Sequence, residues 1–249
     1  MKATLFALFV ALLMVGCGES SQPSESAEMK NTDPEKDAVE TAVDWSKLQD
    51  RDGVTYLPNT DKPFSGYAKR AYENEQIEAL AQFKDGYVVR FKIWEENGTP
   101  RRDLGFIEGK VAQSDVPFEY WSDLNSSHYD GLYSVWHSNG QKLCEGNFKN
   151  GMQDGLWTFW NANGQKKLLS NWKDGKEDGL RADWYENGKK KEEMNYKEGK
   201  IMSAEVWKLT GEKCSVTNYK DGNGVVVWYK DDGTERGRLT YKDGELVID

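Results

Sequence analysis

Cysteine and histidine are scarce in this chain. Three cysteines and two histidines occur in 249 residues. Metal sites and nucleophilic or acid–base catalysis depend on clusters of such residues, and neither His128 nor His137 has a cysteine or a paired carboxylate motif beside it. The run Gly222-Asn223-Gly224 is better explained as a turn than as a phosphate-binding loop. We therefore expect a non-enzymatic protein that uses no cofactor and no metal.

A surplus of basic residues is also missing. Lysine and arginine number 33 against 42 aspartate and glutamate residues, which gives a formal net charge of −9. The basic run at 189–191 is followed at once by Glu192 and Glu193. Nucleic acids and anionic lipid head groups are attracted mainly by clustered positive charge, so neither is expected as a purely electrostatic partner.

Long hydrophobic runs are absent except at the start of the chain. Leu5–Val15 follows Lys2 and is too short to span a bilayer comfortably, which is typical of a targeting segment. It ends in Leu13-Met14-Val15-Gly16-Cys17, which resembles the lipobox of bacterial lipoproteins. The resemblance implies a signal peptide over 1–16 and lipid attachment at Cys17. The alternative is an ordinary secretory signal with an incidental cysteine.

Residues 17–50 contain few large apolar side chains, and their first part is rich in Ser, Glu, Asp, Lys and Pro. Such a segment cannot bury enough surface to offset the entropy of ordering, so we expect a disordered tether. With a lipid on Cys17, the protein is expected to be exported and membrane-anchored, at the periplasm or cell surface. Gly18 after the cysteine favours the outer membrane, if the cell has one, by analogy with lipoprotein sorting.

A repeated sequence motif occupies the rest of the chain. Gly140, Gly164 and Gly188 are 24 residues apart, as are Trp136, Trp160 and Trp184, and a fixed period of this size indicates a repeat architecture. Each unit closes on an aromatic residue followed three positions later by glycine. This closing motif occurs seven times, and its glycines are Gly86, Gly109, Gly151, Gly175, Gly199, Gly222 and Gly244.

Each unit predicts a β-hairpin. Asn-Gly between β-competent runs favours a type I′ turn, and a two-residue loop would pair Trp136 with Leu143. The same register places Phe148 opposite Gly131, where the ring would cover backbone that lacks a side chain. Cys144 and Cys214 then lie three hairpins apart, about 29 Å at the usual strand spacing, which is too far for a disulfide. The position of His137 varies between units, so we expect it to be exposed.

These motifs, DG-x-W-x-x-W/Y-x-x-NG and aromatic-K-x-G, resemble the MORN repeat, specifically the bacterial variant labelled YwqK-like. The resemblance covers roughly residues 51–244. It implies an all-β domain over 51–249, in which about seven tandem hairpins form one elongated, twisted antiparallel sheet. It also implies non-catalytic interaction surfaces, some of which are proposed to touch lipid, and it carries an antitoxin label. The interval between the closing glycines Gly109 and Gly151 is longer than the others, which predicts an insertion near 111–128. This insertion could make a specific contact or serve as a passive linker, and the sequence favours neither.

One row of aromatic residues is the candidate interaction surface. Its members are Trp94, Trp136, Trp160, Trp184, Trp207 and Tyr229. Half-buried aromatics are ordinary in sheets, so packing between neighbouring strands is favoured over binding. The functional hypotheses are a protein-interaction or scaffold module at the cell envelope, an antitoxin that neutralises a toxin by binding, and peripheral lipid binding by the repeats.

Overall fold

The computed structural model describes residues 34–112, 126–243 and 245–247. The expected signal peptide, Cys17 and the first half of the expected tether lie outside these residues, and so does most of the expected insertion, 113–125. Among the described residues, every helix is too short or too polar to cross a membrane.

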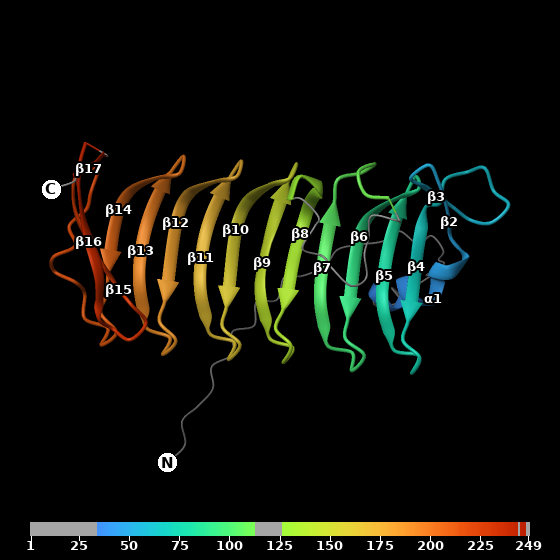
Figure 1. Cartoon of the computed structure of the whole chain (residues 1–249), viewed down its shortest axis with the longest axis horizontal. Helices are drawn as coiled ribbons and strands as arrows, with labels where there is room; N and C mark the ends of the chain where they lie inside the picture. Colours follow the sequence, from blue (N-terminus) through green and yellow to red (C-terminus); the bar gives the residue numbers. More distant parts are fainter. Residues whose placement is uncertain (1–33, 113–125, 244, 248–249) are drawn as a thin grey trace, which may run out of the picture. The chain divides into compact units, whose positions relative to one another are not determined.

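The fold is one twelve-stranded sheet in which the strands from β4 to β14 lie side by side in chain order (Figure 1). This confirms the expected all-β architecture of tandem hairpins. The strands of this sheet are β1 (Val43–Asp44), β4 (Gly66–Ala71), β5 (Ile77–Lys84), β6 (Tyr87–Trp94), β7 (Pro100–Phe106), β8 (Tyr129–Trp136), β9 (Lys142–Lys149), β10 (Met152–Trp160), β11 (Lys166–Lys173), β12 (Lys176–Trp184), β13 (Lys190–Lys197) and β14 (Lys200–Val206).

Two smaller sheets flank this one in the sequence. β2 (Gln49–Arg51) pairs with β3 (Val54–Tyr56), and the last sheet contains β15 (Gly224–Tyr229), β16 (Glu235–Lys242) and β17 (Glu245–Val247). The described helices are α1 (Pro34–Thr41) and the 3₁₀ turns η1 (Trp45–Lys47) and η4 (Ser126–His128). The seventh unit therefore forms its own sheet instead of continuing the long one.

The prediction of two-residue type I′ turns at Asn-Gly is wrong. At Asn139-Gly140 only the glycine has positive φ (82°), and the His137 N–H bonds to the Gln141 carbonyl across a three-residue loop. The Asn139 side chain accepts from the Gln141 N–H at 3.1 Å, which fixes the turn without a positive φ at asparagine. The two-residue turns are instead the closing ones, where Asn150 (φ 50°) and Gly151 (φ 80°) are both left-handed, as type I′ requires.

The predicted register is confirmed over most of each hairpin and is wrong beside the turn. Phe148 lies opposite Gly131 as expected, and the same pairing occurs at Phe83–Gly66, Trp172–Gly155 and Tyr196–Gly179. Trp136, however, pairs with Lys142 and not with Leu143, because the longer loop moves the first pair by one residue. A bulge at Leu143 then restores the register.

Residues 34–50 differ from the expected tether. Val43–Asp44 adds a parallel strand to β4, Leu48 is buried, and the Trp45 ring lies 5.6 Å from that of Phe83. The Lys69 ammonium donates to the Val39 carbonyl of α1 at 2.8 Å. The few apolar residues here are sufficient because they cover the first edge of the long sheet, whose unpaired backbone groups would otherwise face water.

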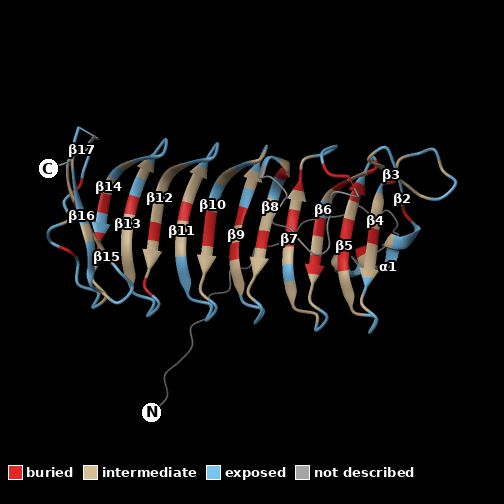
Figure 2. Ribbon diagram, in the orientation of Figure 1, coloured by how far each residue is buried: buried red, intermediate tan, exposed pale blue. Residues whose placement is uncertain are grey.

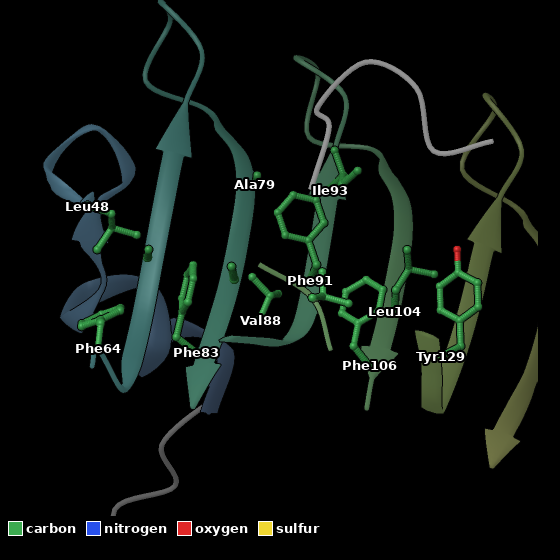
Figure 3. Packing of buried hydrophobic residues seen from close by; sticks show 13 residues of the cluster. Leu48, Phe64, Ala79, Phe83, Val88, Phe91, Ile93, Leu104, Phe106 and Tyr129 are labelled. Carbon is green, nitrogen blue, oxygen red and sulfur yellow. The ribbon is translucent and has the colours of Figure 1, made fainter. Parts of the chain in front are cut away.

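The two faces of the long sheet differ in composition. Tyr133, Phe148 and Trp157 belong to what we call the aromatic face, where ring centroids lie 5.0–5.6 Å apart. Near the start of the sheet this face is covered by the chain from Trp45 to Phe64, which forms the core shown in Figure 3. Buried residues form bands across the middle of the strands, whereas most of the turns are exposed (Figure 2).

Gly146 is the tightest glycine on the aromatic face. A Cβ added there would lie 2.1 Å from Cδ2 of Trp157, whose indole N–H is held by the Asn147 carbonyl at 3.0 Å. We predict that Gly146→Ala lowers the free energy of unfolding by about 1–3 kcal/mol, because the ring must move. Gly237→Ala is the control, since no atom lies within 4 Å of its added Cβ. Urea unfolding measures both, and equal midpoints for the two variants would contradict this packing.

Candidate interaction surface

Five of the six candidate residues share one column of the long sheet. Trp94, Trp136, Trp160 and Trp184 are the last residues of β6, β8, β10 and β12, and Trp207 directly follows β14. The sixth, Tyr229, ends β15 in the separate three-stranded sheet and is not part of this column. All six side chains are half-buried. We call the side of the sheet that carries the column the tryptophan face.

Lysines lie between the tryptophans. Lys142, Lys166 and Lys190 pair directly with Trp136, Trp160 and Trp184 across each hairpin. The Lys142 ammonium lies 5.5 Å from the Trp136 ring centroid, and Lys190 lies 5.1 Å from that of Trp207. Such cation–π contacts stabilise the column internally. Part of the tryptophan surface is therefore occupied by the protein's own side chains.

A row of leucines accompanies the column. Residues four positions apart in a strand share a face, so Leu132, Leu156 and Leu180 lie on the tryptophan face. Each is four positions before a tryptophan of the column. Leu156 is 49% exposed. The residues between the two rows are small: Ser134, Thr158 and Ala182, all buried. The leucine row was missed in the sequence, although the 24-residue recurrence of Asp-Gly-Leu could have revealed it.

In three units the residue that follows the first strand (β4, β8 or β12) holds the next unit in place. The Tyr185 hydroxyl donates to the Trp207 carbonyl at 2.7 Å, and the Tyr72 hydroxyl donates to the Trp94 carbonyl at 2.9 Å. His137 Nε2 lies 3.0 Å from the Trp160 carbonyl. The expectation that the His137 position is variable and exposed is therefore wrong in its second part, since His137 is half-buried and Tyr185 is fully buried.

The equivalent residue Asn161 breaks this pattern. Its amide nitrogen is buried and has no hydrogen-bond partner among the described residues. Asparagine is shorter than histidine or tyrosine, which explains why its side-chain nitrogen does not reach the Trp184 carbonyl.

Opposite substitutions at these two positions test the contact. Tyr185→Phe should lower the free energy of unfolding by about 1–2 kcal/mol, because it leaves the buried Trp207 carbonyl without its donor. Asn161→His should raise it by roughly 0.5–1.5 kcal/mol, because histidine can reach the Trp184 carbonyl as His137 reaches Trp160. Denaturant unfolding followed by tryptophan fluorescence measures both changes. A neutral Tyr185→Phe together with a destabilising Asn161→His would refute the contact.

A charged cluster lies on the aromatic face of β12 and β13. The Arg181 guanidinium bonds to Glu177 at 2.9 Å and to Asp183 at 3.1 Å. Asp183 pairs directly with Glu192 across the hairpin. Burial, and then the charge of Asp183, raises the pKa of Glu192 to about 7. Near neutral pH this carboxyl group therefore holds a proton that an exposed glutamate would release.

The raised pKa predicts a stability that depends on pH. Because the folded pKa lies above the ordinary value of 4.5, the folded state binds the proton more tightly, and stability falls as pH rises from about 4.5 to about 7. Glu192→Gln should abolish this decline and stabilise the protein at pH 8 by on the order of 2 kcal/mol. Glu73→Gln, in an exposed turn, is the control. Thermal unfolding measured across this pH range checks the prediction. Parallel curves of stability against pH for the wild type and Glu192→Gln would contradict it.

Groups suited to metal binding are not assembled in the described part of the chain. No three His, Cys, Asp or Glu residues there lie close enough to hold a metal ion. Cys144 and Cys214 are both buried free thiols. Burial raises the pKa of Cys144 to about 11, so this thiol stays protonated and unreactive at neutral pH.

Comparison with known families identifies the central hairpins. The family model of the MORN repeat variant matches residues 129–150, 153–174 and 177–198. These three matches coincide with the hairpins β8–β9, β10–β11 and β12–β13. The chain is therefore similar to the MORN repeat variant over three tandem hairpins. A comparison with curated proteins finds no match.

Proposed function

We propose that this chain is a non-enzymatic binding module whose tryptophan face contacts another protein at the bacterial cell envelope. Lipid on Cys17 would hold it at the membrane, as the lipobox-like run before that residue suggests. MORN repeats often serve as protein- or lipid-interaction modules, and such a role needs no catalytic group. Neutralisation of a toxin would be one case of this protein binding.

The exposure of Leu156 is the observation that carries the proposal. This residue is 49% exposed, although it lies on the same face as half-buried Trp160, in the middle of three near-identical hairpins. A large apolar side chain in such a row is a typical anchor for a partner protein, because its burial on binding is favourable.

Leu156→Asp tests the proposal with little risk to the fold, because the side chain is already exposed. We predict that a protein recovered with the wild-type chain from solubilised membranes is lost at least about tenfold with this variant, since a carboxylate cannot be buried at an apolar contact. Leu239→Asp is the control, as Leu239 is also exposed (39%) but lies on β16 of the separate sheet.

Equal recovery with both variants would contradict the assignment of the tryptophan face.

The tryptophan–lysine column also favours a second candidate function, lipid binding, since both residue types are common at membrane interfaces. Two of the column's lysines are paired with glutamates, however, at Lys142–Glu145 and Lys190–Glu193. Lys213, which bridges to Trp207, is likewise paired with Glu205. If a Cys17→Ser chain floats with anionic vesicles, and stops floating after Leu156→Asp, the tryptophan face binds lipid and not a protein partner.

A further inference from the structure

The sixth unit departs from the repeat. In the three units before it, the second limb of the hairpin is an eight-residue strand: β9, β11 or β13. After β14 the corresponding limb, 213–220, forms no strand, and it is paired only by the isolated bridges Ser203–Lys220 and Trp207–Lys213. The Cys214 N–H bonds to the Val206 carbonyl at 2.7 Å, and the Ala204 N–H bonds to the Tyr219 carbonyl at 3.3 Å. Between these two bonds the limb bows away from the strand.

The bowed limb is held from its other side by β15. The Asn218 side-chain oxygen accepts from the Val225 N–H at 2.8 Å, and the Thr217 hydroxyl oxygen accepts from the Val227 N–H at 3.1 Å. Val226 and Val227 are themselves buried. The separation between this limb and β14 is therefore a fixed feature of the fold.

A groove of about 330 Å³ opens between the limb and the sheet. Glu193 and Asn195 of β13, with Ser203 and Glu205 of β14, form one wall, which we call the sheet wall. The other, the limb wall, includes Asn218 and Lys220. This volume is at the lower end of the range for small-molecule sites.

The two walls differ in hydrogen-bonding character: one carries acceptors and the other carries donors. The sheet wall carries acceptors: the carboxylates of Glu193 and Glu205, and the side-chain oxygen of Asn195, whose nitrogen already donates to Ser203 at 3.1 Å. The limb wall carries donors: the ammonium of Lys220, and the side-chain amide nitrogen of Asn218, whose oxygen is already used by β15. A hydroxyl group both donates and accepts, so a ligand with several hydroxyls can bond to both walls at once.

The charges of the groove cancel. Glu193 is paired with Lys190 at 2.5 Å, and Glu205 is paired with Lys213 at 2.8 Å. A strongly charged ligand would meet side chains of its own sign, because Glu193, Glu205 and Lys220 all line the groove, and an apolar one would leave the polar walls without partners. Lys213 also lies 6.0 Å from the Trp207 ring, beside a second hollow of about 440 Å³ lined by Lys189, Lys190, Trp207 and Gly211. Longer ligands therefore have an aromatic surface next to the groove.

We propose that this groove binds a neutral, hydroxyl-rich ligand of the oligosaccharide class. The sugar hydroxyls donate to the sheet wall and accept from the limb wall, and a neighbouring sugar reaches the Trp207 side. The site shares only β13 with the three hairpins of the MORN repeat match, and it does not depend on a protein partner at Leu156.

Saturation-transfer NMR on the full chain, kept in a detergent without sugar groups, tests the proposal. The probes are cellotetraose, maltotetraose and the tetramer of N-acetylglucosamine, with glutamate and glucuronate as charged comparators. We expect at least one tetrasaccharide to bind more tightly than either charged compound. Asn195→Ala and Lys220→Ala should each weaken that binding by about threefold to tenfold, the effect of one lost hydrogen bond.

Asn147→Ala is the matched control. Asn147 is the residue of β9 that corresponds to Asn195 of β13, and it is exposed and outside the groove. The control should bind like wild type, and unchanged unfolding curves will show that the variants are folded. Three results would each overturn the proposal: no tetrasaccharide bound at millimolar concentration, tighter binding of a charged compound, or equal binding by Asn195→Ala, Lys220→Ala and the control.

Discussion

The fold depends on hydrogen bonds between one hairpin and the next. An isolated hairpin is at best marginally stable in water, and its outer strands expose unpaired N–H and C=O groups. Strands of neighbouring hairpins pair directly, β9 with β10 and β11 with β12. The turns between hairpins are held as well, because the N–H groups of Gly151, Gly175 and Gly199 donate back to the first strand of the hairpin that each one closes, at 2.8–3.0 Å. The Asp130 carboxylate also accepts from the Asn150 N–H at 2.9 Å. Each unit is therefore completed by its neighbour, which explains the nearly constant repeat length.

This dependence concentrates the apolar cores at the two ends of the array. One buried cluster extends from Leu48 to Tyr129 and the other from Met194 to Val227. At the first end, residues 34–64 cover the sheet, and at the second the bowed limb and β15 do so. The three central hairpins, which match the MORN repeat variant, lie between the clusters and are stabilised mainly by their neighbours. Their tryptophan face is consequently available for a partner, and exposed Leu156 lies there.

The sequence predicted the repeats and their register, but not the details that break the pattern. Phe148 could be placed against Gly131 because the 24-residue period and the alternation of a strand fix the pairing. Asn139-Gly140 could not be assigned to one turn type, because asparagine stabilises either a positive φ or a side-chain-bonded turn. The docking of Trp45 and Leu48 was missed because two apolar residues in a polar segment look like a tether until the sheet edge that they cover is known. The groove beside β14 was invisible for a similar reason: residues 213–220 keep the spacing of the repeat without forming its strand.

Amide hydrogen exchange at the closing turns tests the central claim most directly. The N–H groups of Gly151, Gly175 and Gly199 lie in the turns between hairpins, where amides ordinarily exchange fast because turns are open to water. If these turns are held against the sheet as described, the three amides exchange as slowly as those in the middle of β10 and β12. Exchange at the rate of an unprotected turn would contradict the account, because the hairpins would then be joined by their strands alone.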